Sequence, residues 1–90
     1  MIKAVVSVIG KDKPGIIYGV SKILFENNIN ILDISQTVMQ DIFSMAMLVD
    51  IKNMPLEFSN LVELMNKEGE RLGMQVTVCH EEIFNSMHRI

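Results

Sequence analysis

The six residues Gly10-Lys11-Asp12-Lys13-Pro14-Gly15 constrain the fold of this chain more than any other segment. An alternating apolar run, residues 2–9, precedes them, and an apolar-periodic segment, residues 16–24, follows. This order predicts a strand, a tight loop and a helix with Pro14 in its first turn. The first amides of a helix lack intrahelical partners and glycine permits close approach, so the corner suits a small anionic group such as an amino-acid carboxylate. Backbone geometry alone also explains two glycines and a proline at a turn, and both interpretations stay open.

The remaining apolar pattern predicts three more strands and a second helix. Residues 29–39 form a strand whose alternation slips near Leu32-Asp33, which indicates a β-bulge, and a turn at Gln40-Asp41 follows. Residues 43–51 alternate cleanly, a helix starts after the break at residues 52–55 and ends near Gly73, and residues 74–78 form the last strand. The first strand is apolar on both sides, so we expect it in the centre of the sheet.

The order of these elements predicts an α+β fold of the ferredoxin-like βαββαβ type. Two similar halves build a four-stranded antiparallel sheet with both helices on one face. Residues 81–90 form a short amphipathic C-terminal helix outside this unit, because their apolar residues recur at helical spacing: Ile83, Phe84, Met87 and Ile90. We therefore divide the chain into a domain, residues 1–80, and a C-terminal tail, residues 81–90.

The second face of the sheet has no helix to cover it and predicts association. It carries a good share of Val, Ile, Met and Ala, and its edge strands are free to pair with another chain. We expect a homodimer with two-fold symmetry, and a higher oligomer stays open. The tail either folds back over this face or packs on a second copy.

Charge and composition exclude several classes of partner. The net charge is −3 and the eight basic residues are scattered, which argues against nucleic acid and against an anionic membrane. The single cysteine forms no intrachain disulfide, and no segment approaches the roughly 20 apolar residues of a membrane span. We expect a cytoplasmic protein.

No pattern in the sequence indicates catalysis or a bound metal. His80 and His88 are too few and too far apart for a zinc site, which takes three or four ligands, and we interpret them as surface residues. A nucleophilic Cys79 would need a positioned base, but the adjacent His80 points to the other face of the strand, so we expect a buried structural cysteine. The segment Gly10–Gly15 lacks the Lys and Ser/Thr that a phosphate-binding loop requires at its end. We expect no enzyme activity, no metal and no cofactor.

Two motifs together resemble the ACT domain. They are Gly10-Lys11-Asp12-Lys13-Pro14-Gly15-Ile16 and, about fifteen residues later, Asn28-Ile29-Asn30-Ile31 at the start of the second strand. The resemblance covers nearly the whole chain, which is similar to small free-standing bacterial ACT proteins. The run Asp33-Ile34-Ser35-Gln36 is similar to the ACT modules of the glycine-cleavage repressor and of formyltetrahydrofolate deformylase.

The resemblance implies a regulatory module that binds an amino acid or a related metabolite where two ACT domains meet. In the family, the residue at Gly15 lets the ligand approach the loop, and the residues at Asp12 and Asn30 hold its amino or carboxylate group. The predicted ligand-binding residues are Asp12, Lys13, Pro14, Gly15, Ile16, Asn30 and Ile31. The alternative is a dimeric assembly module that binds a partner protein and no ligand. In that case Asp12 caps the first helix, Asn30 satisfies the backbone at the helix-to-strand corner, and Lys11 and Lys13 are solvent-facing charges.

Overall fold

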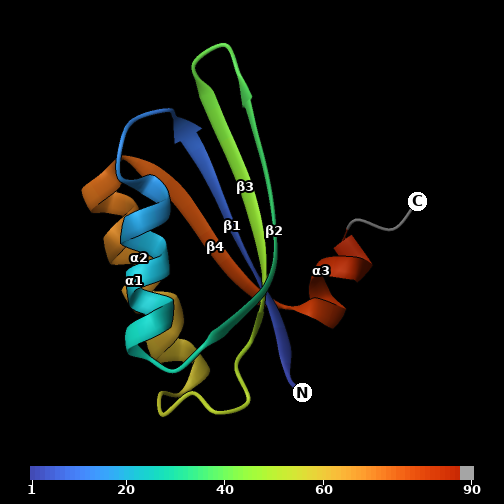
Figure 1. The fold of residues 1–90 in the computed structure, drawn as a ribbon. Helices are drawn as coiled ribbons and strands as arrows, with labels where there is room; N and C mark the ends of the chain where they lie inside the picture. The colour runs from blue at the N-terminus through green and yellow to red at the C-terminus, as the bar shows by residue number, and fades with distance from the viewer. Residues whose placement is uncertain (88–90) are drawn as a thin grey trace.

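The fold is a two-layer βαββαβ sandwich followed by one short helix, as predicted (Figure 1). A computed structural model describes residues 1–87, so His88 and Ile90 lie outside the described residues. The elements are β1 (Lys3–Lys11), α1 (Ile16–Glu26), β2 (Asn30–Met39), β3 (Ile42–Asp50), α2 (Phe58–Leu72), β4 (Met74–His80) and α3 (Glu81–Met87).

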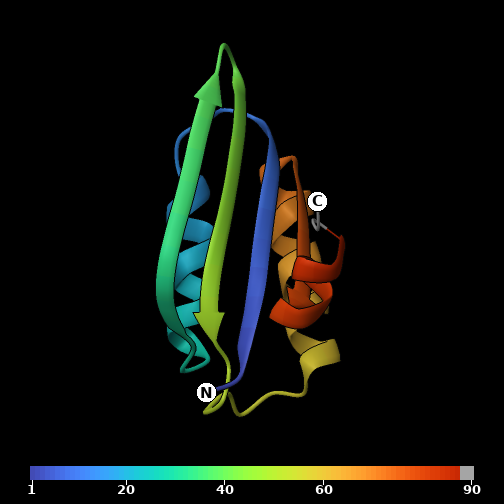
Figure 2. The ribbon, with the colours of Figure 1, turned by 90° about the vertical axis from the view of Figure 1, so that its right-hand side faces the viewer.

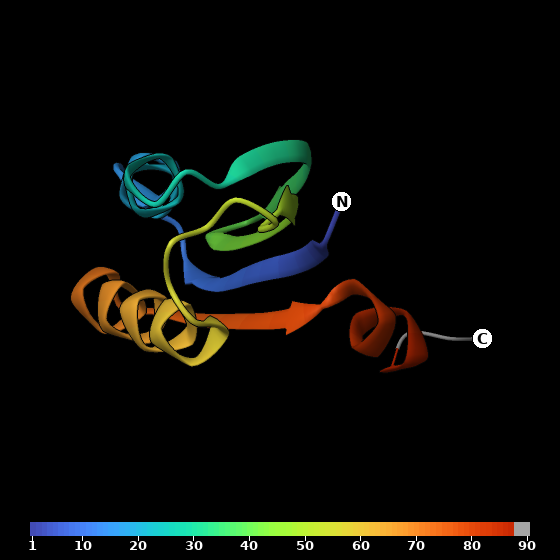
Figure 3. The ribbon, with the colours of Figure 1, turned by 90° about the horizontal axis from the view of Figure 1, so that it is seen from below.

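The four strands form one antiparallel sheet in the order β2-β3-β1-β4. Strand β1 is central, which confirms the prediction from its apolar residues on both faces. Helices α1 and α2 cover one face, and α3 lies on the opposite side of the sheet (Figure 1). Seen along the strands, α1 is on the β2 side of the sheet and α2 is on the β4 side (Figure 3).

Two predicted element boundaries were wrong. Strand β1 extends to Lys11, because Gly10 and Lys11 still pair with β3. Helix α1 begins at Ile16 with Gly15 as its N-cap, so Pro14 precedes the helix and is not part of its first turn. Gly15 has φ 90° and ψ 0°, a left-handed conformation that is not part of a right-handed α-helix, so the helix starts after Gly15. Helix α2 starts at Phe58, three residues after Pro55.

The second half of the sheet follows the sequence pattern closely. The pairing of β2 with β3 shifts register between Ile31 and Asp33, which confirms the predicted bulge. The turn at Gln40-Asp41 is also confirmed, with Gln40 at φ 58°. The alternating residues of β3 are all buried against the helices: Phe43, Met45, Met47 and Val49.

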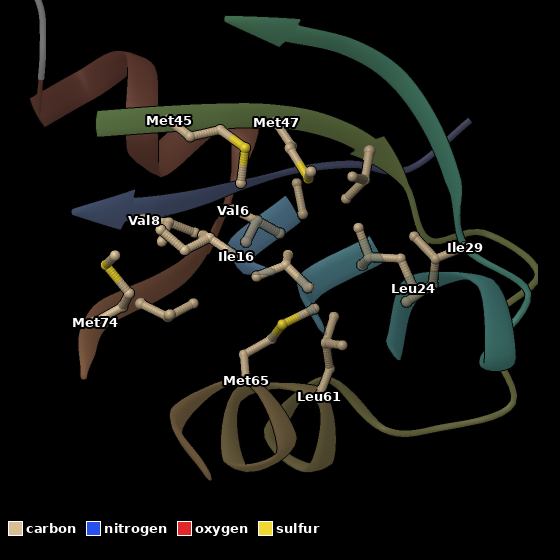
Figure 4. Close-up of a cluster of buried hydrophobic side chains, with 14 of the residues drawn as sticks. Val6, Val8, Ile16, Leu24, Ile29, Met45, Met47, Leu61, Met65 and Met74 are labelled. Atoms are coloured by element: carbon tan, nitrogen blue, oxygen red, sulfur yellow. The ribbon is translucent and has the colours of Figure 1, made fainter. Parts of the chain in front are cut away.

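The core lies between the sheet and the two helices (Figure 4). Its largest fully buried side chains come from α1, β3 and α2: Leu24, Met47, Leu61 and Met65. Flexible thioether side chains fill irregular space, which explains how methionine serves here as a core residue. Two apolar residues of the helices are not fully buried, since Ile17 is 40% exposed and Val62 is only partly buried.

Helix α3 covers part of the second sheet face, one of the two arrangements left open by the sequence. It contacts β1 and β4, and Val5, which points to this side, is only 6% exposed. The half formed by β2 and β3 is uncovered (Figure 2). The surface of this uncovered half is partly polar and not the apolar face that we expected, because Ser35, Thr37 and Ser44 lie on it among apolar residues.

Replacing Gly69 with alanine is expected to destabilise the fold, although alanine usually favours a helix by about 1 kcal/mol over glycine. A Cβ at Gly69 would lie 2.8 Å from the Met74 carbonyl oxygen and 2.9 Å from Cγ2 of Val76. Because β4 must move away from α2, we expect a loss of about 1–3 kcal/mol in the free energy of unfolding, measured by urea denaturation. Asn66→Ala, at an exposed position of the same helix, is the control and should cost nothing. Equal stability of the two variants would contradict this packing.

Candidate functional site

The loop between β1 and α1 ends in an open, uncapped helix start. No side chain forms a capping hydrogen bond at the N-terminus of α1, so the capping role considered for Asp12 is excluded. No heavy atom lies within 4 Å of the position that a Cβ of Gly15 would occupy. The first amides of α1 therefore have no side-chain partner, and the space beside Gly15 is open.

One hydrogen bond holds this loop in place, and one lysine of the loop approaches the end of α2. The Asp12 amide donates to the Asp41 carbonyl at 2.7 Å, which ties the loop to the turn between β2 and β3. Lys13 is exposed, but a Cβ at Gly73 would lie 3.3 Å from Lys13 Nζ. Gly73 caps the C-terminus of α2, where the helix dipole favours a cation. The Lys13 ammonium group therefore lies near the C-terminus of α2, a position that the sequence did not indicate.

The predicted residues on β2 lie at the other end of the sheet. Asn30 pairs with Asp50, which in turn pairs with Lys3 at the beginning of β1. The loop follows Lys11, eight strand residues further along, which is a distance of about 26 Å. The structure therefore brings Asp12, Lys13, Pro14, Gly15 and Ile16 together at one end and Asn30 with Ile31 at the other, and it does not unite the two groups within one chain.

The corner before Asn30 is satisfied by its neighbours. Asn27 Nδ2 donates to the Ile23 carbonyl at 2.8 Å, and Asn28 Nδ2 donates to the Asn53 carbonyl at 3.2 Å. Asn30 is exposed, and within residues 1–87 its side chain makes no hydrogen bond. The backbone role considered for Asn30 thus belongs to Asn27 and Asn28, which leaves the Asn30 amide able to both donate and accept.

Three exposed aliphatic residues between α1 and β2 were not recognised from the sequence. Ile17, Ile34 and Val38 are 40%, 42% and 50% exposed. The bulge was the signal that could have found two of them, because it puts Ile34 and Val38 opposite the buried residues Met47 and Phe43, on the helix side of β2. We call Ile17, Ile34 and Val38 the aliphatic ledge.

The groove between α1 and α2 is charged, and it contains an ion pair between two residues of α2. Arg71 donates to the two Glu68 carboxylate oxygens at 2.5 and 3.0 Å, and this hydrogen bonding lowers the pKa of Glu68. A Cβ at Gly19 would overlap Glu68 Oε2, so glycine is what lets this pair lie over α1. Lys22 and Glu26 of α1 line the same groove.

His80 and Cys79 differ from their sequence interpretations. His80 is partly buried, with its ring stacked on Phe58 at a centroid distance of 4.2 Å, and is not a surface histidine. Cys79 is only partly buried, and desolvation raises the pKa of its thiol, which disfavours the reactive thiolate. Within residues 1–87, no group of three or more His, Cys, Asp or Glu side chains is placed to hold a metal ion.

The family of this chain follows from comparison with known proteins. The family model described as the ACT domain matches residues 3–79. The chain belongs to the ACT domain family. A UPF0237 protein of Methanocaldococcus jannaschii is 58% identical to this ACT protein over 90 residues, which is 100% of both chains.

Solved structures agree with this membership. An ACT domain protein from Streptococcus pneumoniae superposes with a TM-score of 0.80 at 36% identity, over 92% of this chain and 93% of that one. Two more distant structures share the fold alone. A formyltetrahydrofolate deformylase from Pseudomonas syringae has a TM-score of 0.82 at 20% identity, over 89% of this chain and 28% of its own. A putative glycine cleavage system transcriptional repressor has a TM-score of 0.71 at 22% identity, over 88% and 45%. The predicted resemblance is confirmed.

Membership in the ACT domain family indicates the general type of function of this protein. ACT domains are typically regulatory, and they commonly dimerise and bind small molecules. This character points to regulation and not to catalysis. Within the described part of the chain, none of the helices is long and apolar enough to cross a membrane.

Proposed function

We propose that this ACT domain senses an amino acid, or a closely related metabolite, at the interface of a homodimer. The observation that supports the proposal most directly is the split arrangement of its candidate residues. An uncapped helix start at Gly15 lies at one end of the sheet, and Asn30 lies at the other end, on a free edge strand. Two copies can unite these halves.

Strand β2 is the edge best suited to pair with a second copy. It is ten residues long, nearly all of its side chains are exposed, and Asn30–Met39 contains no Lys, Arg or Pro and one charged residue, Asp33, at the bulge. Natural edge strands usually carry such residues because they prevent pairing with other chains. The opposite edge, β4, is shorter and continues into α3.

Antiparallel pairing of two β2 strands would complete the site. Two-fold symmetry reverses the direction of the second strand, so that its Asn30 end approaches the end of the first copy where the β1–α1 loop lies. Helix α1 is on the β2 side of the sheet, next to this edge (Figure 3). Each dimer would then contain two sites, and each site would take Asp12–Ile16 from one copy and Asn30 with Ile31 from the other.

The chemistry of such a site suits an α-amino acid. The uncapped amides of α1 can bind a carboxylate, and the Asp12 carboxylate can accept hydrogen bonds from an ammonium group. Asn30 can donate to the first group or accept from the second. Pro14 restricts the loop, and the hydrogen bond from the Asp12 amide to the Asp41 carbonyl ties it to the β2–β3 turn, so little order is lost on binding.

Regulation through such a site requires a partner that distinguishes the bound and free states. A ligand shifts an equilibrium only by its different affinity for the two states. Tyr18 and Phe25 of α1 are 70% and 84% exposed, and exposed aromatic residues favour a protein partner. The same observation supports the alternative, an assembly module without a ligand.

We place the protein in the cytoplasm because it has one cysteine, which is free.

Ligand-dependent stabilisation tests the proposal. We expect that screening the purified protein against the twenty amino acids and a few one-carbon and purine metabolites yields a compound that raises its melting temperature. At 100 times its Kd, a ligand adds about 2.7 kcal/mol, which is roughly 10–20 °C for a domain of this size. The shift should disappear in a folded Gly15→Asp variant. A flat screen with a folded dimer would refute the sensor and favour the assembly module.

A further inference from the structure

We propose that the ligand is an amino acid with an uncharged aliphatic side chain, which packs on the aliphatic ledge. This inference rests on the proposed function and names the class of ligand. The ledge consists of three side chains that water contacts in the single chain, Ile17, Ile34 and Val38.

The geometry of α1 puts Ile17 on the side that faces β2. Gly19 and Lys22 mark the side that faces α2, because both line the groove with Glu68 and Arg71. At 100° per residue, Ile17 lies about 160° from Gly19 around the helix axis. It therefore projects away from α2, and α1 has β2 on that side.

The register of β2 puts Ile34 and Val38 on the same side of the sheet as α1. Residues directly opposite each other on paired strands point to one face. Ile34 pairs with Met47 and Val38 with Phe43, and both partners are buried under the helices. Ile31 precedes them on this face and packs against the core. The ledge thus continues the core outward to the free edge.

The ledge lies within reach of a ligand held at the loop. Val38 is at the end of the sheet that leads to the loop, since its partner Phe43 also pairs with Gly10. Ile17 is two residues from Gly15 in the first turn of α1. A carboxylate bound at the start of α1 therefore leaves the side chain of the same ligand directed along the ledge or along its counterpart in the second copy.

The pattern of charge around the ledge selects against charged ligands. The helix-side residues of β2 and the β2 side of α1 are all uncharged: Ile17, Ser21, Ile31, Ile34, Gln36 and Val38. The charged residues of α1 are on the α2 side, in the groove with the Glu68–Arg71 pair. A charged ligand side chain on the ledge would lose hydration and find no charged partner among these residues, whereas each buried methylene gains affinity.

Calorimetric titration of the wild-type dimer with a homologous series tests the inference. The series is glycine, alanine, 2-aminobutyrate and norvaline, in which each member adds one carbon to the side chain. We expect the Kd to fall about fourfold per methylene, the equivalent of about 0.8 kcal/mol, and aspartate, glutamate, lysine and arginine to bind more weakly than alanine. Glycine or a charged amino acid binding as tightly as norvaline would overturn the inference and leave the sensor function intact. Binding of none of these amino acids would also overturn the inference, whereas the sensor function is refuted only if the wider screen described above is flat as well.

Two ledge variants distinguish direct contact from a general apolar preference. Ile34→Ala and Ile17→Ala should reduce the gain in affinity from glycine to norvaline. Ile17 is on α1 and is not part of the β2 backbone, so its variant leaves the backbone pairing of β2 intact. The matched control is Ile9→Ala, because Ile9 is 48% exposed on the other face of the sheet. If the affinity of both ledge variants still increased with the length of the ligand side chain as in the wild type, side chains of the second copy would fill the ledge. This result would refute the proposal.

Discussion

A dimer of one Gly15→Asp chain and one Asn30→Ala chain is expected to bind one ligand with wild-type affinity, although each variant alone binds at least about 10-fold more weakly. In the proposed dimer, each site takes its loop from one copy and Asn30 from the other. The mixed dimer therefore contains one site with two altered parts and one site with two intact parts. The measurement is calorimetric stoichiometry on mixed dimers that are purified through two different affinity tags.

The two substitutions remove binding for different reasons. Gly15→Asp brings a second carboxylate close to the ligand carboxylate, and two like charges 4 Å apart repel by about 4 kcal/mol at an effective dielectric constant of 20. We expect at least a 100-fold loss of affinity. At the φ of 90° that Gly15 adopts any side chain strains the backbone, but aspartate tolerates positive φ better than most residues, so the variant should fold with reduced stability. Asn30→Ala removes the polar group that the second copy provides, and we expect a loss of about 10-fold or more.

One further mixture controls for the purification itself. A dimer of the Gly15→Asp chain and a chain with both substitutions contains no intact site and should not bind. If the first mixed dimer also fails to bind, the site is not shared between two copies. Binding at two sites per mixed dimer would contradict the roles of both residues.

Two lysines on β2 are expected to convert the dimer into a monomer. Ser35 and Thr37 are exposed on the edge strand, so Ser35→Lys/Thr37→Lys should leave the fold of the chain unchanged. Across a two-fold axis each lysine meets those of the second copy, and the four like charges oppose pairing. We expect the dimer dissociation constant to rise at least 100-fold. Light scattering should then give the chain mass of 10.2 kDa in place of twice that mass.

The other edge of the sheet provides the matched control. Gln75 and Thr77 are exposed on β4, on the same face of the sheet, and Gln75→Lys/Thr77→Lys adds the same charge. This variant should stay dimeric. The opposite result, a monomer from the β4 variant and a dimer from the β2 variant, would move the interface to β4 and would also remove the basis for a shared site.

The sequence predicted the order of the elements because each of them has its own pattern. The alternation of β3 and the slip at residues 31–33 are local, and both were confirmed. The predicted end of β1 was wrong because Gly10 and Lys11 do not continue the apolar pattern, and only their pairing with β3 extends the strand. Pro14 was assigned to the helix because its preference for a first turn is general, whereas Gly15 sets the actual start.

The candidate site was less predictable, since it depends on contacts between segments far apart in the chain. The position of Lys13 near the end of α2 joins residues sixty positions apart. The stacking of His80 on Phe58 and the burial of Val5 on the side of α3 are of the same kind. Periodicity reports which face a residue occupies, but it does not report which other segment covers that face. For the same reason the sequence did not reveal that Asn30 and Gly15 lie at opposite ends of the sheet.

The bulge in β2 has a consequence for how relatives of this chain can diverge. If the extra residue were accommodated close to the β2–β3 turn and not at Leu32, Asp33 would pair with Met47 and the residues between the two positions would turn over. The helix side of the edge would then carry Asp33, Ser35 and Thr37, an acidic and hydroxylated surface, and the aliphatic residues would face the other way. The strand would keep its length, so the turn and the loop that contacts it would be unaffected. A change in the position of the bulge along β2 can thus replace an apolar surface by a polar one. Relatives of nearly equal composition can then prefer ligands of opposite polarity.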